Sequence, residues 1–152
     1  MGERLRAGRR VWRVENHGRR GAARSEHRRG EDVVVAWHWR GGHARTVVLV
    51  HGIGMGQQCF GLLRAELCRS SDVVAIDLPG FGESPEPTRQ ASMPECADHV
   101  AAVVRDLGIA PIVAIGHSMG TQVVAELAVR HPDLVDRLVL IGPTVDARRR
   151  SK

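Results

Sequence analysis

The sequence predicts an α/β fold in which helices cover both faces of a mostly parallel sheet, giving a three-layer α/β/α sandwich. Short apolar runs of strand length alternate along the chain with longer segments in which apolar residues recur at helical spacing. Turns rich in glycine or proline separate the two kinds of segment. The 152 residues are 43% hydrophobic and 26% charged, which is ordinary for one globular domain with its own core.

Charge divides the chain into three parts. Residues 1–30 hold ten Arg and three Glu, and residues 148–152 add three Arg and one Lys. Residues 31–147 instead carry eight basic and fourteen acidic side chains, so the formal net charge of +5 comes from the two ends. We expect 1–30 to be a disordered extension with at most a short strand at 11–14, 31–147 to form a partial core, and 148–152 to be a basic tail.

Composition argues against several classes of function. The basic ends have no interleaved aromatic residues and no nucleic-acid module, so we expect no nucleic-acid partner. No apolar run has the length of a membrane span, and the N-terminus lacks the apolar region of a secretory signal, so we expect a cytoplasmic protein without a membrane partner. Cys59, Cys68 and Cys96 form no C-x-x-C pair, which predicts reduced thiols. We expect no metal or organic cofactor.

The first elements of the core can be placed in order. Residues 33–40 are β-branched and aromatic and predict a strand that turns at Gly41-Gly42 in a hairpin connection. Residues 46–50, TVVLV, are apolar throughout, as expected of a strand covered on both faces. A helix over about 58–68 and a strand over 73–77 follow.

The second half of the core continues the alternation. Helical spacing of apolar residues predicts a helix over 93–107. A strand over 112–115 comes next, and a helix over 119–131 stops before Pro132. The last element is the strand 137–141, RLVLI, whose apolar run is typical of a strand with a neighbour on each side.

The turn over residues 116–120, Gly-His-Ser-Met-Gly, joins a strand to a helix and has the G-x-S-x-G pattern of a nucleophile elbow. Ser118 would occupy the apex of so tight a turn that we expect a positive φ angle there. Gly116 and Gly120 would remove side chains that otherwise collide. The hydroxyl then projects above the sheet, and the backbone N–H of Met119 opens a helix, where an oxyanion can bind.

Three motifs in register resemble the N-terminal half of the α/β-hydrolase core. They are His51-Gly52 after a buried strand, the segment DLPGFGES over 77–84, and the elbow at 116–120. The resemblance covers about residues 33–145. It implies an α/β-hydrolase-type fold of which the C-terminal part is missing from this sequence.

The same resemblance implies a serine hydrolase that acts by acyl transfer on a small-molecule substrate with an ester-like or activated carbonyl group. By position, Ser118 matches the nucleophile, and the backbone N–H groups of Met119 and Ile53 match the oxyanion hole. We expect structural roles for Asp77 and Ser84, which would hold the loop that they flank.

In the family, the acid and the His that acts as general base follow the nucleophile by long stretches of sequence. This sequence ends soon after the strand 137–141 and does not supply them in that way. His131 lies at the far end of a helix, roughly 18–20 Å from Ser118. His117 adjoins Ser118 and is expected to point away from it. Asp146, just past the last strand, is the one candidate acid. Other histidines are expected to be structural or exposed: His51 as a brace of the oxyanion loop, and His38, His43 and His99 at the surface.

Two alternatives remain open. The segment 52–56, Gly-Ile-Gly-Met-Gly, follows a strand and opens a helix as a dinucleotide loop does, and Asp77 ends the next strand where a ribose-binding acid would lie. The third glycine of that motif, however, falls on Gln57. In the second alternative, the chain as given keeps the hydrolase half-sheet but is catalytically silent. Its sheet would also end at an open edge over 137–141, through which we expect self-association.

Overall fold

The computed structural model describes residues 12–16 and 22–144, with side chains described from Ala22 on. The strands are β1 Trp12–Asn16, β2 Ala22–Arg29, β3 Asp32–Trp39, β4 Thr46–Val50, β5 Asp72–Asp77, β6 Ile112–His117 and β7 Val135–Ile141. The helices are α1 Gly61–Leu67, α2 Met93–Leu107 and α3 Met119–Arg130, with short 3₁₀ helices η1 Gln57–Phe60 and η2 Pro132–Leu134.

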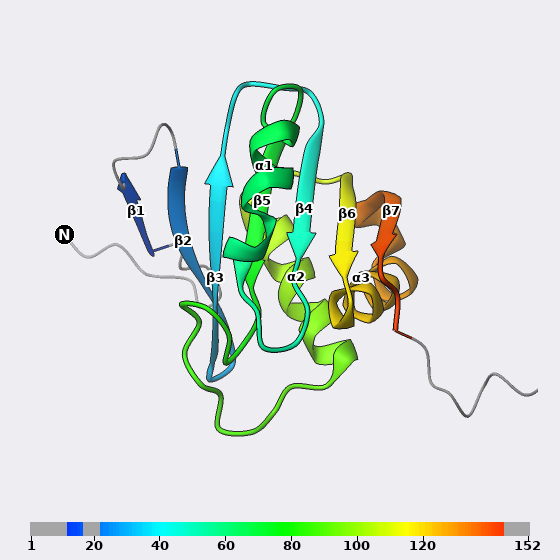
Figure 1. The fold of residues 1–152 in the computed structure, drawn as a ribbon. Helices are drawn as coiled ribbons and strands as arrows, with labels where there is room; N and C mark the ends of the chain where they lie inside the picture. The colour runs from blue at the N-terminus through cyan, green and yellow to red at the C-terminus, as the bar shows by residue number, and fades with distance from the viewer. Residues whose placement is uncertain (1–11, 17–21, 145–152) are drawn as a thin grey trace, which may run out of the picture.

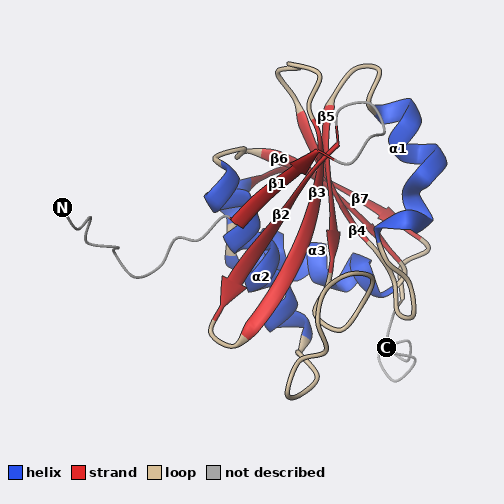
Figure 2. Cartoon of the chain, turned by 90° about the vertical axis from the view of Figure 1, so that its left-hand side faces the viewer, coloured by secondary structure: helices blue, strands red, loops and turns tan. Residues whose placement is uncertain are grey.

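The described strands form a single sheet in the order β1-β2-β3-β5-β4-β6-β7. Strands β5, β4, β6 and β7 run parallel to one another, while β1, β2 and β3 join antiparallel at one end. Figure 1 shows the arrowheads of β4, β6 and β7 at the same edge of the sheet. Helix α1 covers one face and helices α2 and α3 cover the other (Figure 2). The predicted three-layer α/β fold is therefore confirmed.

Each face of the sheet carries its own apolar layer because side chains alternate along the strands. On one face the central strands pack against α2 and α3 through Val48, Val50, Ile76, Ala114, Val100, Val104, Val123 and Leu127. On the other face they pack against η1 and α1 through Val47, Leu49, Val73, Ala75, Ile115, Phe60, Leu63 and Leu67. The two layers together fix β4 and β6, which lead into the two loops of the candidate site.

Helix α2 has the bounds that the sequence predicts, and local signals account for them. Ser92 and Glu95 form a capping box, in which the Glu95 N–H faces the Ser92 hydroxyl and the Glu95 carboxylate accepts from the Ser92 N–H. Gly108 ends the helix in the left-handed conformation, with φ of 62°.

The prediction that residues 1–30 form a disordered extension before a fold beginning near Asp32 is wrong for β2. Strand β2 pairs with β3 along its whole length, and β1 extends the sheet beyond it. The error has a physical cause, since the buried side of β2 includes the polar residues Ser25 and His27 and shows no apolar run. The predictions for the other residues of 1–30 and for the tail 148–152 lie outside the described residues.

The predicted hairpin at Gly41-Gly42 is also wrong, because β5 lies between β3 and β4. The segment after β3 crosses the end of β5 instead. There the Asp72 carboxylate accepts hydrogen bonds from the N–H groups of Gly41 (2.8 Å) and His43 (3.0 Å). The Gly41-Gly42 pair therefore belongs to a crossover connection, which the Asp72 carboxylate holds in place.

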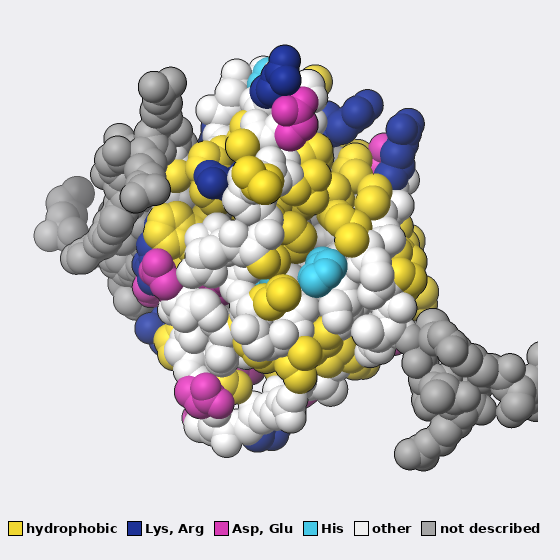
Figure 3. All heavy atoms as spheres, viewed as in Figure 1, with side chains coloured by type: hydrophobic (Ala, Val, Ile, Leu, Met, Phe, Trp, Pro, Cys, Tyr) yellow, Lys and Arg dark blue, Asp and Glu magenta, His cyan; other side chains and the backbone are white. Residues whose placement is uncertain are grey.

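Strand β7 forms the edge of the described sheet and pairs only with β6. Its large apolar residues are 38–46% exposed: Leu138, Val139, Leu140 and Ile141. Figure 3 shows hydrophobic side chains spread over the face that carries α1 and reaching the β7 side of the molecule. The helices of the described region are all too short or too polar to cross a membrane.

Candidate active site

The turn between β6 and α3 places Ser118 in a strained conformation. Its φ is 53° and its ψ is −119°, and among the described residues it alone has positive φ without being glycine. The Ser118 N–H donates to the carbonyl of Ile141 (2.9 Å), and the Ser118 carbonyl accepts from the N–H of Thr121 (3.0 Å). The positive φ predicted for the elbow is confirmed.

Close backbone contacts explain why glycine flanks this turn. A Cβ atom on Gly116 would lie 2.3 Å from the carbonyl oxygen of Gly120. A Cβ atom on Gly120 would lie 2.2 Å from the carbonyl oxygen of Val50, at the end of β4. Both obstacles are backbone atoms that cannot rotate away, so the elbow packs at a distance that only glycine permits.

The loop after β4 passes directly beside the serine. A Cβ atom on Gly52 would lie 3.0 Å from the Cβ of Ser118. Ile53 follows in this loop with its side chain 66% exposed, and Met119 opens α3 on the other side of Ser118. The two residues predicted to supply oxyanion donors therefore belong to the two segments that meet at Ser118.

His51 braces this loop, as predicted. It is fully buried, and its Nε2 accepts from the N–H of Leu78 (3.0 Å). Because an amide can only donate, the proton lies on Nδ1, which donates to the carbonyl of Gly52 (2.7 Å). Burial lowers the pKa of His51 and favours this neutral form. The ring also makes an edge contact with Phe81, at 5.3 Å between centroids.

Asp77 and Ser84 hold the neighbouring loop, again as predicted. The fully buried Asp77 carboxylate accepts from the N–H groups of Gln57 (2.7 Å) and Glu83 (3.2 Å). The Ser84 hydroxyl donates to the Asp77 carbonyl (2.5 Å) and accepts from the N–H of Val35 (2.9 Å). Because both Asp77 oxygens are engaged inside the protein, the structure does not offer this carboxylate to the ribose of a dinucleotide.

A hollow of about 630 Å³ opens between the two glycine-rich loops at this end of the sheet. No charged side chain lines it; the lining residues are Gly54, Met55, Gly56, Gln58, Cys59, Gly80, Phe81 and Gly82. This hollow was not predicted from the sequence, although the many glycines of both loops are a usable signal for open space.

The structure brings no base to Ser118 from the residues it describes. His131 lies at the far end of α3, where its Nε2 donates to Asp98 (2.8 Å). The Nδ1 of His117 is buried without a hydrogen-bond partner among the described residues. The candidate acid Asp146 lies outside the described residues.

Two histidines expected at the surface are buried instead. His38 is 4% exposed and bonds the hydroxyl of Ser25 (2.8 Å), while His99 is 3% exposed and bonds Asp32 (3.1 Å). The prediction for these two is wrong because their partners come from β2 and from the start of β3, which sequence spacing does not connect to them.

The three cysteines are free thiols, as predicted. Cys59 is exposed and Cys96 is buried, and burial raises the pKa of Cys96 to about 11. Within the described part of the chain, no group of three or more histidine, cysteine or acidic side chains could hold a metal ion.

The chain is similar to known hydrolases over most of its length. A family model described as alpha/beta hydrolase fold matches residues 45–150. The 2-hydroxymuconate semialdehyde hydrolase of Pseudomonas sp. (strain CF600) is 36% identical over 100 residues, covering 63% of this chain and 35% of that protein. The (E)-2-((N-methylformamido)methylene)succinate hydrolase of Acinetobacter baylyi (strain ATCC 33305 / BD413 / ADP1) is 27% identical over 108 residues, covering 71% and 41%.

A solved structure of an esterase is also similar to this chain. The thermophilic esterase from Thermogutta terrifontis superposes with a TM-score of 0.71 at 30% identity, covering 80% of this chain and 46% of that chain. The chain spans about a third of the length of the curated relatives it matches.

Proposed function

Because the chain belongs to the α/β-hydrolase family, we propose that it carries the nucleophile half of a serine hydrolase, with Ser118 as the nucleophile. One observation carries the proposal: Ser118 has φ of 53° between two glycines whose Cβ positions are blocked by backbone. Such strain persists only where the surrounding structure imposes it, and it is typical of functional sites.

In the proposed reaction the Ser118 oxygen attacks the carbonyl carbon of an ester-like substrate while a base removes the hydroxyl proton. The backbone N–H groups of Met119 and Ile53 bind the developing oxyanion. The carbonyl re-forms as the bond to the leaving group breaks, and the base returns its proton to that group. Water then attacks the acyl-serine and releases the acid.

The base belongs to the proposal as well. Since no described histidine bonds the Ser118 hydroxyl, we place the base outside residues 12–16 and 22–144. We expect the described residues alone to be nearly silent, because an unassisted serine hydroxyl is a weak nucleophile. Asp146 stays a candidate for the acid that would orient such a base.

The substrate proposed is a small molecule that presents an uncharged group to the hollow between the two glycine-rich loops. That hollow is lined by glycine backbone and by Met55, Cys59 and Phe81, and no charged side chain faces it. An ester-like or activated carbonyl compound fits both this lining and the relatives named as hydrolases and an esterase.

A fluorophosphonate probe tests the nucleophile and the missing base together. We expect slow labelling of the wild-type chain that becomes faster when imidazole is added, because imidazole can accept the hydroxyl proton. The Ser118→Ala variant should show neither labelling nor rescue. The matched control is Ser70→Ala, an exposed serine outside the site, which should label like wild type. Equal labelling of Ser118→Ala would overturn the proposal.

Self-association is proposed through the open edge formed by β7. Among the described strands β7 pairs only with β6, so its outer edge and its exposed apolar side chains can template pairing with a second copy. We expect light scattering at micromolar concentration to report species larger than a monomer, and Leu140→Lys to shift them toward monomer. Leu62→Lys, on a residue 92% exposed in α1, is the control and should change nothing. A monomeric wild-type chain would contradict the proposal. The cytoplasmic location and the lack of a nucleic-acid partner stay predictions.

A further inference from the structure

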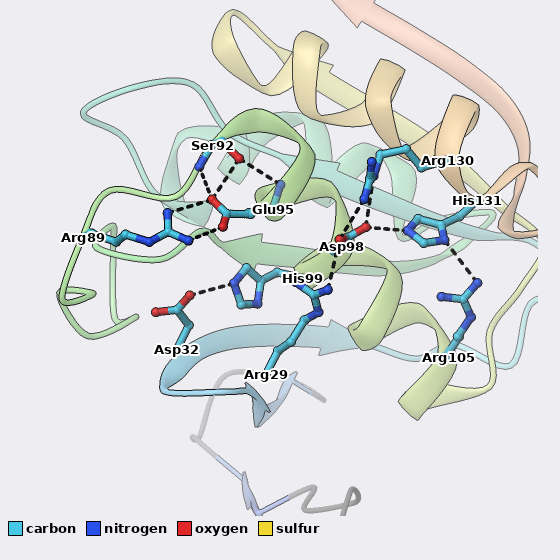
Figure 4. A network of polar contacts seen from close by, with 10 residues as sticks. All are labelled: Arg29, Asp32, Arg89, Ser92, Glu95, Asp98, His99, Arg105, Arg130 and His131. Carbon is cyan, nitrogen blue, oxygen red and sulfur yellow. Dashed lines mark hydrogen bonds and ion pairs between the residues drawn. The ribbon is translucent and has the colours of Figure 1, made fainter.

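A second polar site lies at the end of α3 opposite Ser118. Helix α3 is twelve residues long, so about 18 Å separates its two ends. A hollow of about 410 Å³ opens there between β2, α2 and α3. Its lining is rich in charge: Arg29, Asp98, Ala102, Arg105, Asp106, Arg130 and His131. Figure 4 shows the guanidinium groups of Arg29, Arg105 and Arg130 approaching the same region from different elements.

The Asp98 carboxylate is the centre of this cluster and is fully engaged. It accepts from Arg130 through Nε (3.1 Å) and a terminal nitrogen (3.0 Å), from Arg29 (3.0 Å) and from His131 (2.8 Å). The hydrogen bonds from Arg130 contribute most to holding the pKa of Asp98 at about 2. The carboxylate therefore stays ionised. It fixes Arg130 through two nitrogens and engages only one nitrogen of Arg29.

Arg29 and Arg105 retain unused donors beside the hollow. A guanidinium group has five N–H donors. Among the described contacts, Arg29 spends one terminal nitrogen on Asp98. Arg105 donates to Nδ1 of His131 (3.3 Å). Its distance to the Asp133 carboxylate, 3.8 Å between nitrogen and oxygen, is too long for a hydrogen bond. Both arginine side chains are 49% exposed, so a ligand from solvent can reach them.

The charge of the lining favours an anion. Three arginines face two carboxylates in the lining, which leaves one net positive charge. The Asp106 carboxylate is already bonded to Nδ1 of His27 (3.0 Å). Asp133 lies outside the hollow and its side chain is 69% exposed, so solvent screens its charge.

The geometry points to an anion site that takes a phosphoryl group, either as free phosphate or as a phosphate monoester. Donors left on Arg29 and Arg105 approach from two elements, which suits the several oxygens of a tetrahedral anion better than one flat carboxylate. Asp98 already occupies the bidentate position on Arg130. The site is independent of Ser118 and of any hydrolase activity.

Thermal melting of the 152-residue chain with sodium phosphate tests the site, with sodium chloride at equal ionic strength as the reference. At a tenfold excess over Kd we expect Tm to rise by about 3–6 °C. Methyl phosphate in place of phosphate distinguishes the two sources: a shift at least as large indicates a phosphate monoester, and a smaller one indicates free phosphate.

Variants decide whether the arginines are responsible. Arg105→Gln and Arg29→Gln should each weaken the apparent affinity for phosphate at least fivefold. Arg69→Gln removes the same charge from an exposed residue at the end of α1 and should not weaken it. Ser118→Ala should bind phosphate normally even if it abolishes labelling by the fluorophosphonate. The same Tm shift in all these variants, or none beyond that of chloride in wild type, would overturn the site.

Discussion

The two halves of the sheet are stabilised in different ways. In the parallel half, β4 and β6 are apolar strands whose buried residues include Leu49, Val50 and Ala114, all fully covered. In the antiparallel half, β2 buries Ser25 and His27, and β3 buries His38 beside its valines. There the Ser25 hydroxyl bonds both histidines at 2.8 Å, and His27 reaches Asp106 on α2 at 3.0 Å.

The difference shows what each kind of interior requires. The apolar half needs only complementary shape, and at the elbow a Cβ atom on Gly116 or Gly120 would collide with backbone atoms. The polar half needs every donor to find an acceptor. When His27 is neutral and donates from Nδ1 to Asp106, its Nε2 accepts from the Ser25 hydroxyl, whose oxygen then accepts from His38. One chain of hydrogen bonds thus joins β3, β2 and α2, and it fails as a unit.

The largest expected effect is on the apolar half. Gly120→Ala places a Cβ atom 2.2 Å from the Val50 carbonyl oxygen, and β4 cannot move away without leaving its neighbours in the sheet. We expect the free energy of unfolding to fall by about 3 kcal/mol or more. Chemical denaturation measures it. Gly61→Ala is the control: nothing lies within 4 Å of its Cβ position, and the change should be neutral or stabilising by about 0.5 kcal/mol. Equal effects would contradict the backbone contact.

The polar half should weaken first in acid. Burial lowers the pKa of His38 to about 4, with Arg40 and His27 adding repulsion, whereas an unfolded histidine titrates near 6.5. Between these pH values the unfolded chain binds more protons than the folded chain. The contribution of His38 to the free energy of unfolding is therefore fully present above pH 6.5 and is lost as the pH falls toward 4. The loss is roughly 3 kcal/mol.

Urea unfolding at several pH values checks this loss. His38→Gln should flatten the dependence between pH 4 and 6.5, whereas His43→Gln, at a half-buried position after β3, should leave it unchanged. An unaltered pH dependence in His38→Gln would show that another group governs the acid sensitivity.

A smaller effect is expected from Ser25→Ala. The change removes the shared hydroxyl and leaves a buried nitrogen on both His27 and His38 without its partner. We expect a loss of about 2 kcal/mol in the free energy of unfolding. Ser70→Ala, on an exposed serine after α1, is the matched control and should change stability by less than about 0.5 kcal/mol. A loss for Ser25→Ala no larger than this control would mean that the network does not stabilise β2.

The same contrast explains how much could be predicted from the sequence. Apolar runs and the Gly-x-Ser-x-Gly spacing predict β4, β6, α3 and the positive φ of Ser118, because these features are encoded locally. Strand β2 could not be predicted, since its buried His27 bonds Asp106, which lies 79 residues away in the sequence. The proposed phosphoryl site could not be predicted for the same reason, because Arg29 and Arg130 come from distant segments and both bond Asp98.

Mass spectrometry of the chain after incubation with 4-nitrophenyl acetate and imidazole tests directly whether Ser118 is a nucleophile. Imidazole can assist the attack by Ser118, and its removal by rapid gel filtration leaves no described base to activate water for deacylation. We therefore expect a mass gain of one acetyl group, located by peptide mapping on the peptide that contains Ser118. Acetylation confined to lysine, cysteine or other serines, with Ser118 unmodified, would contradict it.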